Sequence, residues 1–162
     1  MKKLLVIYFF LFALILDTEI YAQTTRLLRA PDISDTHITF AYGSDIWVAD
    51  LATLTSRRLT STAAVESNPM FSPDGKTIAI TSNRFGSPAV FIVPVTGGEA
   101  TRITWHSSGA VVRGWTPDGK NILYASPRET APSNYNRLWT VPATGGPSAM
   151  LAKQWGNDGA YS

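Results

Sequence analysis

The sequence predicts an all-β fold, a partial β-propeller of about three four-stranded blades, because two different turns recur in step. A Ser-Pro-Asp-Gly turn at 72–75 returns as Thr-Pro-Asp-Gly at 116–119, 44 residues later. A Thr-Gly-Gly turn at 96–98 returns at 144–146, 48 residues later, and the extra residues fit in the polar stretch 129–136. A period in the forties that holds four short strands is typical of a propeller blade.

Each Pro-Asp-Gly turn has the residue order of a type I turn between two paired strands. A side-chain acceptor stands at the first position, proline with its preset φ at the second, and glycine at the fourth. Apolar residues on both sides predict a hairpin. For the best copy of the repeat we expect strands at 68–71, 77–82, 90–95 and 100–104. An antiparallel sandwich is the alternative, but it has no need to repeat two turn types in fixed order.

The N-terminus has the pattern of a secretory signal peptide over residues 1–22. Two lysines precede an apolar run at 4–16, and Ala22 offers a small residue before a cleavage point. The run is shorter than the roughly 20 residues that a membrane span needs. Ile20, however, is larger than the residue usually found three positions before a cut. We therefore expect an exported protein, periplasmic or secreted, with an uncleaved membrane anchor as the alternative.

The rest of the chain divides by its repeats. Residues 28–151 are predicted to form the blades of an incomplete propeller, and residues 152–162 the start of a further blade, with 154–158 leading into it. Residues 27–31 lead into blade one, which contains a hairpin of 37–42 with 45–50. Blade two runs from about 67 to 104 and blade three from about 111 to 151.

Three blades do not complete a propeller. A ring closes with about four to eight blades, so three leave two sheet faces open. We expect those faces to carry Phe91, Ile92 and Trp139 into water, and patches of that size mark an interface or an incomplete chain. The expected partners are therefore the remaining blades and domains of a longer chain. Assembly of several three-blade copies into a ring is the alternative.

Composition narrows the chemistry that the chain can carry. There is no cysteine, which excludes a disulfide framework, a thiol nucleophile and a zinc knuckle. The net charge is +2, and removal of residues 1–22 leaves it unchanged. A balance that small predicts neither a nucleic-acid partner nor a membrane surface as partner.

No residue is predicted to be catalytic, cofactor-binding or metal-binding, and no cofactor is expected. His37 and His106 have no partner at a recognisable spacing, so each is interpreted as an ordinary strand-end or loop histidine. No G-x-S-x-G elbow occurs, and the Gly-Gly pairs lack the spacing of a phosphate-binding loop. The Asp-Gly-Lys at 74–76 lacks the further acidic ligands of a calcium loop.

The aromatic residues are interpreted mainly as core. Trp47, Phe91 and Trp139 occupy equivalent places in the three repeats, as packing between blades requires, although carbohydrate binding or base stacking is the alternative. Trp115 precedes a turn and fits either the core or the central channel. Arg84 has a counterpart in Arg128, which favours a repeated structural role over a site.

These motifs support a resemblance. The repeats resemble TolB-type, WD-like propeller repeats, with a Ser-Pro-Asp-Gly turn, an aromatic strand, Gly-Gly and a closing Arg-Leu-Thr. More narrowly, residues 97–107 continuing into 114–120 resemble the N-terminal propeller of tricorn-type proteases, as do 45–48 with 57–60. The similarity covers about residues 28–151.

The tricorn resemblance implies a large serine protease that trims peptides, with a six-bladed propeller, a second propeller, a PDZ domain and a downstream catalytic region. None of its catalytic residues can be placed on this chain, so the implied role here is noncatalytic binding or gating of peptides. Members are often cytoplasmic, whereas the signal peptide predicts export. The alternatives are a TolB-like periplasmic binding propeller without hydrolase activity and, more weakly, an exported prolyl-oligopeptidase relative.

Overall fold

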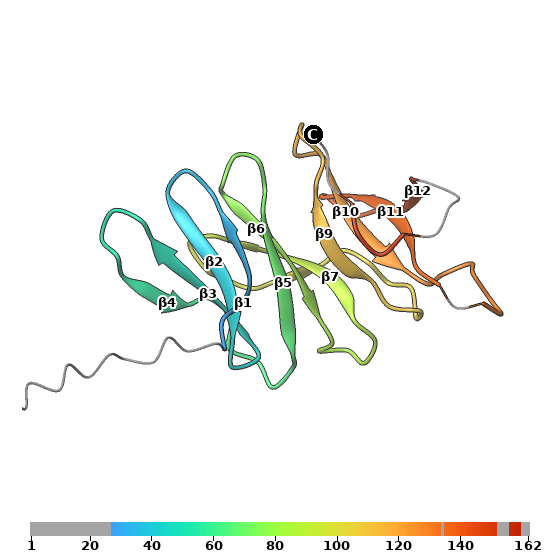
Figure 1. Cartoon of the computed structure of the whole chain (residues 1–162), viewed down its shortest axis with the longest axis horizontal. Coiled ribbons are helices and arrows are strands. Elements are labelled where there is room, and N and C mark those ends of the chain that lie inside the picture. Colours follow the sequence, from blue (N-terminus) through green and yellow to red (C-terminus); the bar gives the residue numbers. More distant parts are fainter. Residues whose placement is uncertain (1–26, 134, 152–155, 160–162) are drawn as a thin grey trace, which may run out of the picture.

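The computed structural model describes residues 27–133, 135–151 and 156–159, and these form only β-structure. Three four-stranded antiparallel sheets lie in a row, with their faces packed against one another (Figure 1). Each sheet is a simple meander in chain order, which is the arrangement of propeller blades. The sandwich alternative is wrong, because the chain makes three successive sheets rather than two. Within the described residues, no helix has the length and apolar character needed to cross a membrane.

The strands follow the predicted repeat closely. The predicted second strand of blade two and the hairpin of blade one have the predicted bounds, whereas the first strand of blade two begins two residues early and its last is shorter than expected. Blade one holds β1 (Arg29–Ile33), β2 (His37–Tyr42), β3 (Asp45–Asp50) and β4 (Ser56–Arg58); blade two holds β5 (Glu66–Phe71), β6 (Thr77–Ser82), β7 (Ala89–Pro94) and β8 (Thr101–Arg102); blade three holds β9 (Val111–Trp115), β10 (Asn121–Ser126), β11 (Arg137–Pro142) and β12 (Ala149–Met150).

The Pro-Asp-Gly turns are closed by their own side chains. The backbone N–H of Gly75 donates to the carbonyl of Ser72 at 2.8 Å, as in a type I turn. The Ser72 hydroxyl donates to Asp74 Oδ1 at 2.6 Å and accepts the N–H of Thr77 at 3.0 Å. These contacts recur at 116–121 with nearly the same distances. The hydroxyl, more than the backbone N–H of Lys76, lowers the pKa of Asp74 below its usual value.

In blades one and two, a threonine just beyond the outermost strand hydrogen-bonds to the neighbouring third strand. The Thr104 hydroxyl accepts the N–H of Val90 at 2.9 Å in a buried position. Thr60 does the same for the N–H of Ile46 at 2.9 Å in blade one. The Arg-x-Thr pattern therefore caps the start of the third strand in blades one and two, whereas blade three has no such pattern and its last strand, β12, is also two residues long.

Apolar residues fill the two interfaces between blades. Side chains alternate along each strand, so successive residues face opposite neighbours. Ile46, Val48, Ile78, Ile80 and Phe91 belong to the cluster between blades one and two. A second cluster between blades two and three contains Ala79, Val90, Val112, Ile122, Tyr124, Trp139 and Val141.

Phe91, Ile92 and Trp139 were expected to be exposed on open sheet faces, and this prediction is wrong for Phe91 and Trp139. Phe91 is 1% exposed and Trp139 is 3% exposed. Both face the preceding blade, which is present, rather than the open end of the row. Ile92 packs half-buried against the cluster with blade three. The residue that does face an open side is Trp47, half-buried and edge-on to Tyr42 with ring centroids 6.0 Å apart.

A backbone hydrogen bond links each blade to the next at the same place in the repeat. The N–H of Glu66 donates to the carbonyl of Ser44 at 2.9 Å, and the N–H of Ala110 to that of Pro88 at 2.8 Å. Gly156 repeats the pattern by donating to the carbonyl of Asn136 at 2.9 Å. This bond supports the prediction that 152–162 begins a further blade, which stays a prediction because 152–155 and 160–162 lie outside the described residues. The predicted signal peptide at 1–22 also lies outside them.

Candidate functional site

A cavity lies between the inner strands of blades one and two. Its volume is about 570 Å³, the size of a pocket for a small ligand or a few peptide residues. The strands β1 and β5 supply two walls and the β2–β3 turn supplies a third. Polar groups that line it come from Arg29, Tyr42, Ser44, Glu66, Ser67 and Asn68.

The backbone around this cavity adopts left-handed conformations at residues other than glycine. Ala30 has φ 47°, Ser44 has φ 71° and Asn68 has φ 51°, and all three line the cavity. Such residues cost of order 1–3 kcal/mol each and gather at functional sites. Ala30 and Asn68 each sit where the strand register shifts, so each is part of a bulge in an inner strand. Bulges of this kind redirect side chains near sites.

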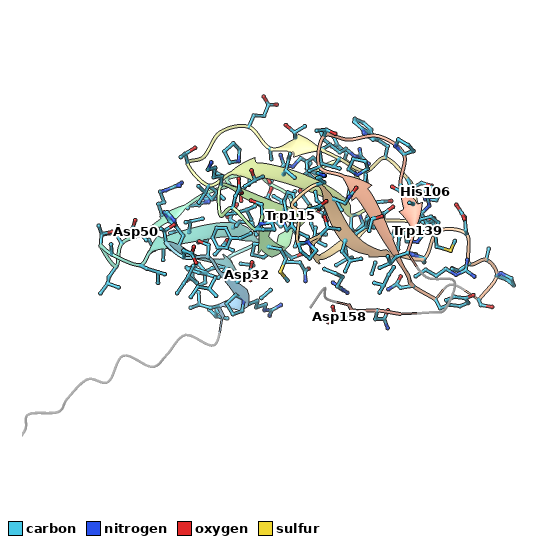
Figure 2. All side chains as sticks on the ribbon, turned by 90° about the horizontal axis from the view of Figure 1, so that it is seen from above. Asp32, Asp50, His106, Trp115, Trp139 and Asp158 are labelled. Carbon is cyan, nitrogen blue, oxygen red and sulfur yellow. The ribbon has the colours of Figure 1, made fainter. Side chains whose placement is uncertain are left out.

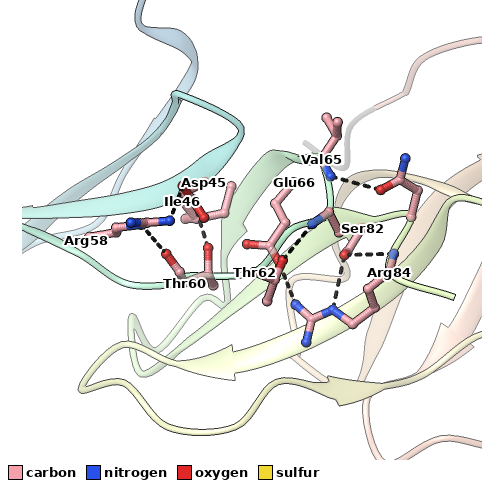
Figure 3. A network of polar contacts seen from close by, with 11 residues as sticks. Asp45, Ile46, Arg58, Thr60, Thr62, Val65, Glu66, Ser82 and Arg84 are labelled. Carbon is pink, nitrogen blue, oxygen red and sulfur yellow. Dashed lines mark hydrogen bonds and ion pairs between the residues drawn. The ribbon is translucent and has the colours of Figure 1, made fainter.

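A buried ion pair stands beside the cavity. Glu66 is 1% exposed, and its Oε1 accepts the Thr62 hydroxyl at 3.1 Å and pairs with Arg84 Nη2 (Figure 3). Arg84 also donates from Nε to the Ser82 hydroxyl at 3.1 Å, and its guanidinium lies 4.5 Å over the ring of Phe91. Among the described residues, Glu66 Oε2 has no hydrogen-bond partner. A buried carboxylate oxygen without a donor is unfavourable, so this one retains capacity to accept a bond.

A second ion pair joins β3 and β4 of blade one. Arg58 Nη2 is 2.7 Å from Asp45 Oδ2, and Arg58 Nε donates to the carbonyl of Thr60 at 3.0 Å (Figure 3). The Asp45 carboxylate is largely buried and directly follows Ser44 of the cavity wall. Each pair combines one positive and one negative side chain, and Arg29 adds a further positive charge to the cavity wall.

Neither histidine lines the cavity. Within the described part of the chain, no group of three or more His, Asp or Glu residues is placed to hold a metal ion. The two histidines do not form a pair: Asp50, which lies 3.7 Å from His37, and His106 are labelled at opposite ends of the molecule in Figure 2. His37 also contacts the Thr36 hydroxyl at 2.8 Å, and His106 accepts the N–H of Ser108 at 3.1 Å.

Three residues singled out from the sequence, Trp115, Arg84 and Arg128, make contacts within or between blades. Trp115 bridges two blades, because its Nε1 donates to the carbonyl of Met70 at 2.9 Å. Arg128 lies 4.1 Å over Trp139, as its counterpart Arg84 lies over Phe91. Only Arg84 of this pair also meets a buried carboxylate.

Sequence reasoning missed the cavity itself. Glu66, Ala30 and Asn68 belong to no motif, and their proximity depends on the packing of blade one against blade two. One signal was available: Ala30 and Asn68 each precede a proline, which in a strand marks an edge or a bulge. Each of these prolines stands within a register shift of its strand.

The fold and the repeated turns define a β-propeller, and comparison with known proteins gives the family. The family model described as the tricorn protease N-terminal beta propeller domain matches residues 25–162. The chain belongs to this family, which confirms the resemblance seen in the sequence.

Individual relatives agree. Tricorn protease homolog 1 of Streptomyces coelicolor is 35% identical over 127 residues, which cover 76% of this chain and 12% of that protein. Tricorn protease of Thermoplasma acidophilum is 34% identical over 108 residues, 60% of this chain and 10% of that protein. The chain therefore spans about a tenth of the length of these relatives.

Solved structures show the same fold. The crystal structure of the tricorn protease superposes with a TM-score of 0.67 at 30% identity, covering 77% of this chain and 13% of that one. A TolB structure from Agrobacterium tumefaciens superposes with a TM-score of 0.69 at 24% identity, covering 80% and 47%. The second likeness shows the fold alone.

Proposed function

We propose that this chain is the noncatalytic N-terminal propeller segment of an exported, serine-type peptidase of the tricorn kind, and that the propeller binds or gates peptide substrates. The family match supports the link to a peptidase, and the apolar segment at 4–16 supports export. The observation that carries peptide binding is the cavity between blades one and two.

The cavity offers groups that complement a peptide backbone. Bulged strands leave backbone groups outside the regular ladder, and β1 and β5 both bulge at the cavity wall. Hydroxyl and amide side chains of Ser67 and Asn68 stand beside them. Peptide main chains present alternating donors and acceptors, which such groups can satisfy without a strongly charged pocket.

A TolB-like binding propeller in the cell envelope is the second candidate. A TolB homolog of Chlorobium luteolum is 38% identical over 64 residues, 40% of this chain and 15% of that protein. Hydrolysis separates the two proposals, because the peptidase proposal requires cleavage of peptides by the complete protein and the TolB-like proposal does not.

Peptide binding can be tested in the complete protein with a cavity-filling substitution. We expect Ser67→Trp to weaken binding of a fluorescent unstructured peptide at least tenfold, measured by anisotropy, because indole fills the space between β1 and β5. Ser61→Trp, at an exposed residue outside the cavity, is the matched control. Equal affinity of both variants and the parent would overturn binding at the cavity.

Export and peptidase class have separate readouts. N-terminal sequencing of the protein from its native host is expected to start at Gln23, in the periplasmic or culture fraction. A retained Met1 in the cytoplasmic fraction would contradict export. Cleavage of unstructured peptides that a serine-reactive phosphonate abolishes would support the peptidase; absence of cleavage would favour the TolB-like alternative.

A further inference from the structure

Two exposed aromatic side chains of blade two lie against one arginine. Phe85, in the β6–β7 loop, is 67% exposed, and Trp105, just after β8, is 76% exposed. The Arg102 guanidinium lies 5.5 Å from the ring centre of Phe85 and 4.6 Å from that of Trp105. Large aromatic rings at this exposure are unusual on a surface that contacts only water.

Blade one has an arginine at the equivalent position, Arg58, and its guanidinium is paired with a carboxylate. Arg58 pairs in register with Trp47 of β3, and Arg102 pairs in register with Phe91 at the equivalent place in β7. Each donates from Nε to a carbonyl two residues ahead, Arg58 to Thr60 at 3.0 Å and Arg102 to Thr104 at 2.7 Å. The two guanidinium groups are therefore held by the same local geometry.

The two blades differ in the group that lies against the terminal nitrogens of the guanidinium. Arg58 Nη2 lies 2.7 Å from the carboxylate of Asp45, the first residue of β3. The first residue of β7 is Ala89, so the equivalent carboxylate is missing. Among the described residues the Arg102 side chain forms no ion pair, and its Nε bond to the Thr104 carbonyl is its sole side-chain hydrogen bond. Its terminal nitrogens thus keep donors that suit a carboxylate.

We propose that Arg102, Phe85 and Trp105 form a docking site for an acidic peptide segment. An Asp or Glu side chain of the segment takes the place against Arg102 that Asp45 takes against Arg58. A neighbouring apolar side chain of the segment lies on the rings of Phe85 and Trp105. Arginine and aromatic residues are the types that dominate binding energy at protein interfaces, and the rings hold the guanidinium in place at little entropic cost.

The charge distribution favours an acidic peptide over a nucleic acid. A nucleic-acid surface needs a row of basic side chains to follow successive phosphates. Here the neighbouring Arg84 is already neutralised by Glu66, and the whole chain carries a net charge of only +2. A guanidinium that lies against two rings and forms no ion pair among the described residues matches one carboxylate beside one apolar group. The site shares no residue with the cavity between blades one and two, so it does not rest on the proposed function.

The test uses the complete protein and a fluorescent peptide with acetylated and amidated ends that contains alternating Asp and Leu. The blocked ends leave side-chain carboxylates as the only anions. We expect binding in anisotropy titrations that weakens at least tenfold in Arg102→Gln, in Trp105→Ala, and when Asn replaces Asp in the peptide. Arg57→Gln, which removes an exposed arginine from β4 of blade one, is the control and should leave binding unchanged.

Ala89→Asp gives a second test that does not depend on removing a side chain. It supplies in blade two the carboxylate that Asp45 supplies in blade one, and it should block the peptide at least tenfold. Circular dichroism of each variant confirms folding. Absence of peptide binding, equal binding of the Asn peptide, or unchanged affinity in both Arg102→Gln and Ala89→Asp would overturn the proposal. An oligonucleotide that binds at Arg102 in place of the peptide would overturn it as well.

Discussion

Replacing Thr104 by valine isolates the hydrogen bond that closes blade two. Thr104 is 6% exposed, and its hydroxyl accepts the N–H of Val90, which is fully buried. Valine has nearly the same shape, so the core contacts stay while the acceptor disappears. The carbonyl of Val90 still accepts the N–H of Ile103 at 2.8 Å, which keeps the strand end in place.

The size of the effect follows from the Val90 N–H, which is left buried without an acceptor in Thr104→Val. A buried N–H without a partner costs about 1–3 kcal/mol. If amide exchange of Val90 proceeds by local opening, that cost raises its rate about 5- to 160-fold. Hydrogen–deuterium exchange with mass spectrometry of peptides that cover β7 measures this in the folded protein.

The control for this substitution is Thr101→Val. Thr101 is exposed in β8, three residues before Thr104, so its replacement should leave β7 exchange within about twofold of the parent, as for surface substitutions generally. Thr60→Val should accelerate exchange of Ile46 in blade one, because the same bond occurs there at 2.9 Å. Unchanged exchange of Val90 in Thr104→Val would refute the role assigned to the Arg-x-Thr pattern.

Ser72→Ala should raise the pKa of Asp74 toward its ordinary value, because the Ser72 hydroxyl is the main cause of its lowering; an NMR titration of the carboxyl checks this, and an unmoved pKa contradicts it. Since the folded-state pKa is the lower one, the stabilisation is present above the unfolded-state pKa and disappears as pH falls through the folded-state value. Phe91→Ala should lower the free energy of unfolding by about 3–5 kcal/mol in urea denaturation, whereas Phe85→Ala, at an exposed ring, should change it by about 0.5 kcal/mol or less. A similar loss in both would show that burial does not decide the difference. Gly119→Ala should cost about 1–2 kcal/mol, seen as a lower thermal midpoint, because its φ is +67°; an unchanged midpoint would mean that the turn relaxes.

The repeat could be predicted from the sequence because the motifs that define it are local. A Pro-Asp-Gly turn and an Arg-x-Thr strand end act over fewer than ten residues, so each copy can be recognised without knowing its neighbours. Strand bounds that depend on backbone pairing alone, such as those of β6, match the prediction. The bounds of β8 do not: the strand was expected to reach residue 104 but ends at Arg102, and beyond it the Thr104 hydroxyl accepts the N–H of Val90.

The candidate sites could not be predicted from local sequence signals. Glu66 and Arg84 are 18 residues apart and meet only because β5 and β6 pair antiparallel. The docking surface combines residues from separate segments: Phe85 from the β6–β7 loop, Arg102 from β8 and Trp105 from the segment after β8. The missing carboxylate partner of Arg102 is evident only beside blade one, where Asp45 pairs with Arg58.

The sequence by itself determined the all-β class, the four-stranded repeat and the family resemblance, since these depend on turns and alternation within single blades. The tertiary structure decided which side of each sheet is covered. Phe91 and Trp139 are buried and Trp47 only half-buried, although all three hold one position in the repeat. A strand residue faces one neighbouring sheet, and among the described residues only blades two and three have a preceding blade. It also decided where the cavity and the unpaired Arg102 lie, because both arise from contacts between segments that the sequence holds apart.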